Sequence, residues 1–155
     1  MPIHKPPLPS PAIAATAGSL RPEELEVTTN ASRSASYRAF AEALAGRKLA
    51  AGWGLQVLRY GPGDYAGPHN DHHPENKDAR GGYIDLHLSL CSPGVAHQWL
   101  VYSRAGHFSE IVSVAKPASV TAYRLPFWHY TTPLAAKPRR TDATRWVLLG
   151  TFLYR

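Results

Sequence analysis

The chain has 155 residues, of which 44% are hydrophobic and 18% charged; this composition excludes general disorder and favours one globular domain. No apolar run reaches the ~18 residues that a membrane-spanning helix needs, and the N-terminus lacks a signal-peptide pattern, so we expect a soluble cytoplasmic protein without a membrane partner. Cys91 is the only cysteine, which excludes an internal disulfide and a thiolate zinc cluster.

The formal net charge of +6 is concentrated near the C-terminus, where residues 101 to 155 carry eight Lys and Arg against two Asp and Glu. A basic face can attract nucleic acid or draw an anionic co-substrate into a cleft. The cluster of Lys137, Arg139 and Arg140 is short and lacks interleaved aromatic residues. Nucleic-acid binding is therefore possible but not favoured.

The chain divides into an N-terminal arm and one domain. Residues 1–30 contain six prolines and no strong period, which predicts a proline-rich arm. The domain is expected to span residues 31–155. It opens with an amphipathic helix at 32–50, where apolar or small residues recur at helical spacing and predict a helix packed on a sheet.

After Gly52 the pattern changes to short β-rich segments separated by Gly, Pro and Asp turns. In YIDLHLSLC, residues 83–91, apolar and polar residues alternate, as in a strand with one apolar and one polar face. About eight such strands after one helix suit a jelly-roll or closed barrel. The predicted strands are 53–60, 65–71, 82–91, 96–103, 108–114, 118–124, 126–132 and 144–154.

Polar residues gather in GPGDYAGPHNDHHPEN, residues 61–76. His69 and Asp71 are two residues apart, so on an extended segment both side chains point to the same side and can reach one ion. His129 is the best candidate for a third ligand, since it lies on a distant β-rich segment. His72 and His73 remain alternatives. Two histidines and one carboxylate form the facial triad associated with non-haem Fe(II).

The run from Leu55 to Arg145 resembles the core of the Fe(II)/2-oxoglutarate-dependent oxygenases. That family has His-X-Asp, a distant His and a following Arg; His69, Asp71, His129 and Arg145 fit this order, and RYGPGDYAGPHND resembles the lead-in to its first ligand. The resemblance implies a double-stranded β-helix (jelly-roll), Fe(II) as the metal, and 2-oxoglutarate as co-substrate. The implied reaction decarboxylates 2-oxoglutarate with O₂ to succinate and CO₂ and oxidises a C–H bond of a small molecule or peptide.

By the same resemblance Arg145 grips the far carboxylate of 2-oxoglutarate, which suits a guanidinium fork. Arg139 and Arg140 compete for this role. The chain departs from the family in having CSPGVAHQ where many members carry Gly-Gly, and Val147 in place of a Ser or Thr. His87, on the polar face of its strand, and Tyr60 are further candidates to contact the co-substrate.

Two other readings remain open. The spacing of Gly63, His69, Asp71, Glu75 and Gly82 overlaps the cupin metal motif, which would add Glu75 as a fourth ligand. That reading predicts a metal-dependent dioxygenase or isomerase that does not use 2-oxoglutarate. The other is a barrel that only binds a ligand or partner. The sequence indicates neither the substrate nor the oligomeric state.

Overall fold

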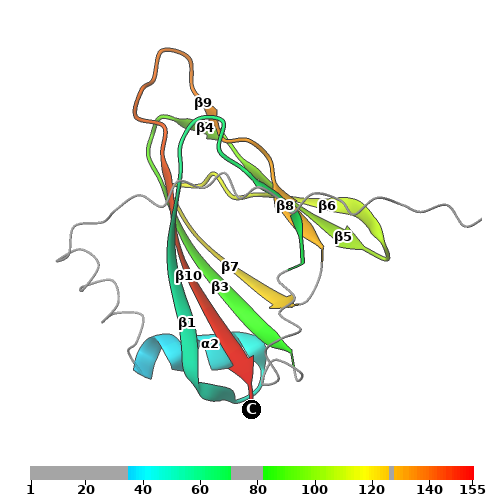
Figure 1. The fold of residues 1–155 in the computed structure, drawn as a ribbon. Coiled ribbons are helices and arrows are strands. Elements are labelled where there is room, and N and C mark those ends of the chain that lie inside the picture. The colour runs from blue at the N-terminus through cyan, green and yellow to red at the C-terminus, as the bar shows by residue number, and fades with distance from the viewer. Residues whose placement is uncertain (1–34, 71–81, 126–127) are drawn as a thin grey trace, which may run out of the picture.

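The computed structural model describes residues 35–70, 82–125 and 128–155. Within these ranges the chain is mainly β, with one helix and ten strands in antiparallel sheets (Figure 1). None of these ranges contains a helix that is long and apolar enough to cross a membrane. The predicted proline-rich arm, residues 1–30, lies outside them.

The larger sheet has the strand order β1, β10, β3, β7, so the last strand of the chain lies at its centre. Its pairing with β3 is continuous, and its pairing with β1 is continuous from Trp53 to Tyr60 but shifts register between Leu49 and Trp53; Arg145 lies opposite Tyr60 on one side and Cys91 on the other. We call this four-stranded sheet the first sheet. Its strands are β1 (Leu49–Tyr60), β10 (Arg145–Tyr154), β3 (Tyr83–Cys91) and β7 (Ala118–Leu125).

A second sheet of shorter strands has the order β2, β8, β5, β6. It faces the first sheet, because Leu100 of β5 packs in one buried cluster with Tyr83 of β3 and Tyr123 of β7. Its strands are β2 (Ala66–His69), β8 (His129–Thr131), β5 (Trp99–Arg104) and β6 (His107–Ser113). A separate two-stranded sheet pairs β4 (Val95–His97) with β9 (Ala135–Ala136).

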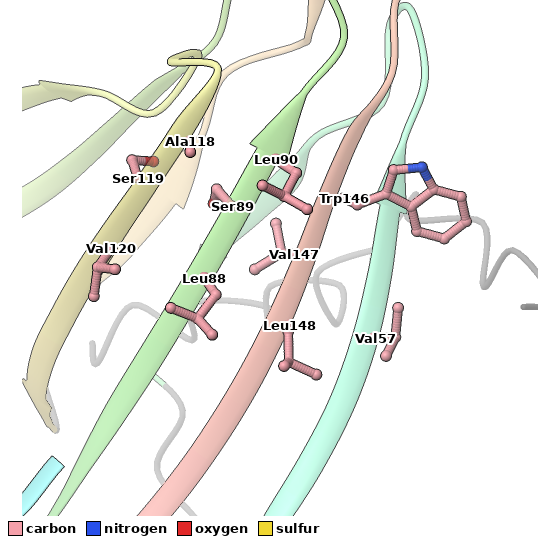
Figure 2. Close-up of a pocket in the computed structure, with 10 residues that line it drawn as sticks. All are labelled: Val57, Leu88, Ser89, Leu90, Ala118, Ser119, Val120, Trp146, Val147 and Leu148. Carbon is pink, nitrogen blue, oxygen red and sulfur yellow. The ribbon is translucent and has the colours of Figure 1, made fainter. Parts of the chain in front are cut away.

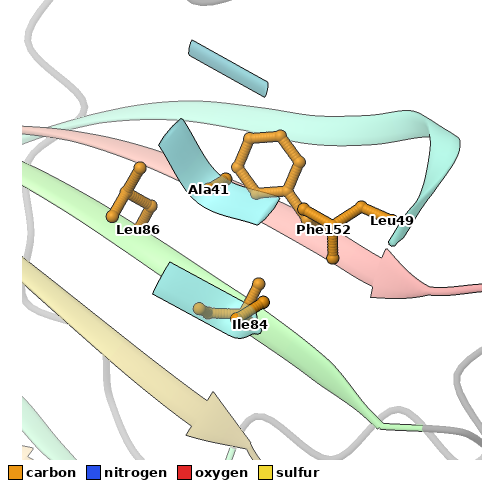
Figure 3. Packing of buried hydrophobic residues seen from close by; sticks show 6 residues of the cluster. Ala41, Leu49, Ile84, Leu86 and Phe152 are labelled. Atoms are coloured by element: carbon orange, nitrogen blue, oxygen red, sulfur yellow. The ribbon is translucent and has the colours of Figure 1, made fainter. Parts of the chain in front are cut away.

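Helix α2 (Ala35–Ala45) packs on one face of the first sheet (Figure 3). This is the outer face, because Ile84 packs with α2 whereas its neighbour Tyr83 packs with Leu100 of the second sheet. The buried residues of α2, Ala41 and Ala45, are small, and Tyr37 packs against the same cluster, while Phe40 and Leu44 remain exposed. The expected helix on a sheet is therefore present, although two of its large apolar residues do not enter the core. The cluster comprises Ala41, Ala45, Leu49, Ile84, Leu86 and Phe152.

The predicted helix boundary at residue 50 was wrong, since α2 ends at Ala45. Gly46 adopts a φ of +69°, and its N–H donates to the carbonyl of Glu42 at 2.9 Å. This is the glycine-terminated arrangement that ends many helices, because glycine enters the left-handed region without steric cost. Arg124 of β7 also donates to the carbonyls of Leu44 and Ala45, two acceptors that the helix itself leaves unpaired.

The strand predictions identified most elements but missed some boundaries. The first strand starts at Leu49 rather than at residue 53, directly after the early end of the helix. The predicted strand 96–103 is two strands, β4 and β5, which pair with different partners on either side of Gln98. The short strand β9 was not predicted, because two alanines carry no alternation signal.

The packing of α2 on the first sheet can be tested at Phe152, which is 0% exposed. Phe152→Ala should lower the free energy of unfolding in urea by about 3–5 kcal/mol, because it removes a buried ring and leaves a cavity. The control is Phe108→Ala on β6, where the ring is 47% exposed and the loss should be about 1 kcal/mol or less. Equal losses at the two positions would contradict this core.

Candidate functional site

Two histidines from distant parts of the sequence lie side by side in the second sheet. His69 ends β2 and His129 begins β8, and the two residues are directly opposite each other in the antiparallel pairing. Opposed residues project from the same face with neighbouring side chains. The two ring centroids are 4.3 Å apart, and His129 is only 4% exposed.

The backbone fixes which nitrogen of His69 carries the proton. Its Nδ1 lies 2.6 Å from the carbonyl oxygen of Gly67, and because a carbonyl can only accept, Nδ1 must donate. In the neutral ring the lone pair is then on Nε2. A metal-binding histidine typically has this arrangement, with the other ring nitrogen donating to a carbonyl or carboxylate that orients the ring.

The expected carboxylate ligand, Asp71, lies outside the described residues, as do the alternatives His72, His73 and Glu75. Among the residues that the structure describes, no group of three or more His, Cys, Asp or Glu side chains could hold a metal ion. The described part of the site therefore contributes two adjacent imidazoles.

Two further rings extend the histidine pair across to the first sheet. Tyr123 of β7 stacks on His129, with the ring centroids 5.7 Å apart and the planes inclined by 13°. His87 of β3 meets Tyr123 edge to face at 4.5 Å. Burial raises the pKa of Tyr123 far above its ordinary value, so the tyrosine is neutral. Its stacked ring fixes the plane of the His129 ring.

Arg145, the first residue of β10, brings a positive charge into the interior between the sheets. It is 2% exposed, and it donates to Ser89 Oγ from Nη2 at 2.9 Å and to Gln98 Oε1 from Nη1 at 3.0 Å. Its Nε also lies 3.3 Å from the same Ser89 oxygen. The guanidinium carbon lies 5.3 Å from the centre of the Tyr60 ring, so the aromatic face also stabilises the charge.

The orientation of the Gln98 amide follows from its partners. Its Nε2 donates to the carbonyls of Asp64 and Thr132 at 3.2 and 3.0 Å, so its oxygen must be the atom that faces Arg145. Gln98 is fully buried. It therefore joins the loop before β2, the loop after β8 and the arginine of β10.

The partners of Arg145 are neutral. Among the described residues no Asp or Glu forms an ion pair with it, and burial lowers the pKa of its guanidinium from the ordinary value. A guanidinium has five N–H groups, of which Ser89 and Gln98 engage three. A buried charge whose described partners are all neutral is unfavourable, so this position is suited to an anionic ligand.

One cavity of about 110 Å³ between the two sheets brings these residues together. It is lined by five of the predicted site residues, His69, His129, Arg145, His87 and Tyr60, which come from five different strands. A larger hollow of about 730 Å³ lies on the outer face of the first sheet, but no ionisable side chain lines it. Of these two, the inner cavity is the one that ionisable side chains line.

The structure does not bring Arg140 to this cavity. Arg140 lies in the loop between β9 and β10, where its Nε donates to Asp142 Oδ1 at 2.7 Å in an exposed ion pair. Its charge is already compensated and screened by solvent. Of the arginines that competed for the carboxylate, Arg145 is the one that lines the cavity.

No protein-family profile matches the chain, and no curated protein matches it in sequence. Its fold is similar to that of a Pseudomonas putida prolyl-4-hydroxylase, at 15% sequence identity and a TM-score of 0.51. The likeness covers 88% of this chain and 67% of that one. A structure of Bacillus endospore appendages, disulfide-linked pili, matches at 11% identity over 66% of this chain and 87% of that one, with a TM-score of 0.44. The latter likeness is too weak to bear on the fold.

Sequence reasoning missed two residues that hold Arg145. Ser89 could have been found, because it continues the polar face of β3 two residues after His87 and meets β10 opposite Val147. Gln98 carries no such signal, since it lies at the break between two strands and its partners are remote backbone carbonyls.

The structural role of Gln98 can be measured by Gln98→Met, which keeps the side-chain length but removes the amide. Arg145 and two buried carbonyls would then lose a partner, so the free energy of unfolding should fall by about 1–3 kcal/mol. Gln56→Met is the matched control, because Gln56 is exposed on β1 and should change stability by about 0.5 kcal/mol or less. Similar small effects at both positions would contradict this network.

Proposed function

We propose that this chain is an Fe(II)- and 2-oxoglutarate-dependent oxygenase, which hydroxylates or otherwise oxidises a C–H bond with O₂ and releases succinate and CO₂. The observation that carries the proposal is a single cavity with two adjacent histidines and a buried arginine that has neutral partners. The substrate would be a small molecule or peptide that reaches this cavity.

The strand order supports an eight-stranded jelly roll of the double-stranded β-helix type. Strands β1, β3, β7 and β10 form one sheet and β2, β5, β6 and β8 the other, so the chain changes sheet at every step except the β5–β6 hairpin. Such repeated crossing is the topology of a double-sheet jelly roll. The fold likeness to a prolyl-4-hydroxylase agrees with it, but the function is argued from the cavity, since one fold supports many activities.

The metal would be held by His69 and His129 together with Asp71. The two imidazoles are adjacent, and the proton on Nδ1 of His69 leaves Nε2 as its ligand atom. Asp71 follows His69 by two residues, the spacing at which an extended chain presents both side chains on one side. When bound, Fe(II) supplies the activation of O₂.

Arg145 would hold the distal carboxylate of 2-oxoglutarate. Ser89 and Gln98 fix the plane of its guanidinium, and the remaining N–H groups are available to a planar carboxylate. Because both described partners are neutral, they leave the positive charge to the co-substrate. His87 and Tyr60 line the same cavity and would shape the space between the two anchoring points.

A cupin-type enzyme that binds metal without 2-oxoglutarate is the alternative on the same fold. Arg145 favours the oxygenase, because the described part of the chain offers its buried charge no counter-ion and an anionic co-substrate would supply one. A barrel that only binds a ligand would need neither the histidine pair nor the metal.

Anaerobic titration with Fe(II) and then 2-oxoglutarate should produce the weak metal-to-ligand charge-transfer band in the visible spectrum. Arg145→Gln should raise the Kd of 2-oxoglutarate at least about 30-fold, which corresponds to about 2 kcal/mol for a lost buried ionic contact. Arg145→Lys, which keeps the charge but loses the fork, should give an intermediate value.

The matched control is Arg140→Gln, which removes an arginine outside the cavity and should leave the Kd within about twofold, as expected for an exposed charge. Circular dichroism of each variant checks that it is folded. Metal binding without the band would favour the cupin-type enzyme, and no metal binding by the wild type would contradict both catalytic proposals.

Metal binding itself is tested with Mn(II) as an oxygen-stable probe in calorimetric titration. His129→Ala should weaken binding more than about 100-fold, because even a residue that merely orients a ligand contributes about 10- to 100-fold. His107→Ala removes an exposed histidine of β6 and should leave the affinity unchanged. Equal affinity in both variants would exclude His129 as a ligand.

A further inference from the structure

Among the described residues, α2 covers only part of the outer face of the first sheet. On β3, Ile84 and Leu86 are buried beneath α2, whereas Leu88 and Leu90 continue the same apolar face beyond the helix, and Leu90 is 60% exposed. Leu148 and Trp146 of β10 extend this uncovered half. Figure 2 shows these side chains on neighbouring strands of the same sheet.

This uncovered half forms a groove of about 730 Å³, which we call the outer groove. Its lining contains no charged side chain. An apolar hollow of this kind, open to water, is typical of a surface that another segment or molecule covers. The lining residues are Val57, Leu88, Ser89, Leu90, Ala118, Ser119, Val120, Trp146, Val147 and Leu148.

The N-terminal segment of the chain starts beside this groove. Tyr37, in the first turn of α2, packs on Phe152 and donates to the carbonyl of Leu86 at 3.5 Å. Leu86 and Gly150 are opposed in register, and the next outward-facing pair on these strands is Leu88 and Leu148, inside the groove. The 34 residues that precede α2 therefore join the described chain next to the groove.

The composition of that segment matches the groove. Residues 6–20, PPLPSPAIAATAGSL, contain no charged residue and four prolines. A proline-rich segment is pre-organised as a polyproline II helix, which rises about 3.1 Å per residue and docks into apolar, aromatic-lined grooves. Four strands spaced about 4.8 Å apart span about 14 Å, a distance that about five residues in a polyproline II helix can cross. Trp146 provides the aromatic surface.

We propose that residues 6–20 dock intramolecularly in the outer groove and complete the cover that α2 begins. Residues 21–34 link the two parts and are long enough to reach any point of the groove. The prediction is independent of the metal site on the inner face of the sheet.

Elastase cleavage of the full chain tests the docking, because Ala12, Ala14, Ala15 and Ala17 are cleavage sites inside the proposed segment. Cleavage proceeds from the undocked form, so its rate follows the population of that form. Leu90→Lys places a charge in the groove at an exposed position and should accelerate cleavage at residues 12–17 at least about tenfold. Val120→Lys is a second variant with the same expected effect.

The matched control is Ile111→Lys, which places the same charge at an exposed apolar position of β6, outside the groove. Its cleavage rate should equal that of the wild type. Equal rates in Leu90→Lys and the wild type would overturn the proposal. So would a wild-type dimer in light scattering that Leu90→Lys makes monomeric without faster cleavage, since a second copy of the chain would then cover the groove.

Discussion

The position of Arg145 depends on the register of β10, and the site depends on Arg145. Because the first eight residues of β10 pair with β1 and β3 without a register shift, Arg145 is held beside Tyr60 and Cys91 and its side chain enters the interior. A one-residue slip would turn every side chain of β10 to the opposite face. The charge would then be in the outer groove and the apolar Trp146 among the histidines, so the register of one central strand separates the two surfaces.

Alternation also determines β3, whose successive side chains point to opposite faces of the first sheet. Asp85, His87 and Ser89 face the second sheet, whereas Ile84 and Leu86 carry α2. The sequence alone predicted this separation, because a period of two is a strong signal in a long strand. The termination of α2 was predicted less well: Gly46 ends the helix through its backbone conformation, while the surrounding apolar spacing continues for several residues.

The candidate-site residues could be predicted where they follow an ordered sequence motif. His69, His129 and Arg145 were chosen from an ordered motif, and the structure places all three around one cavity; that they act as ligands and anchor stays a prediction. Gln98 could not be found in this way. Its role depends on two carbonyls that lie 34 residues away on either side, in loops whose approach is set only by the folded sheets.

The partners of Arg145 among the described residues are neutral, so its buried charge is unfavourable unless an anion lies beside it. A glutamate at position 98 could compensate the charge directly, but its oxygens would face the carbonyls of Asp64 and Thr132, which accept hydrogen bonds from the present amide. It would also neutralise the guanidinium before any ligand arrived. An amide satisfies the carbonyls, orients the arginine and places no negative charge beside it. Sites that bind charged ligands commonly hold such locally unfavourable groups, since the unfavourable free energy is relieved when the ligand binds.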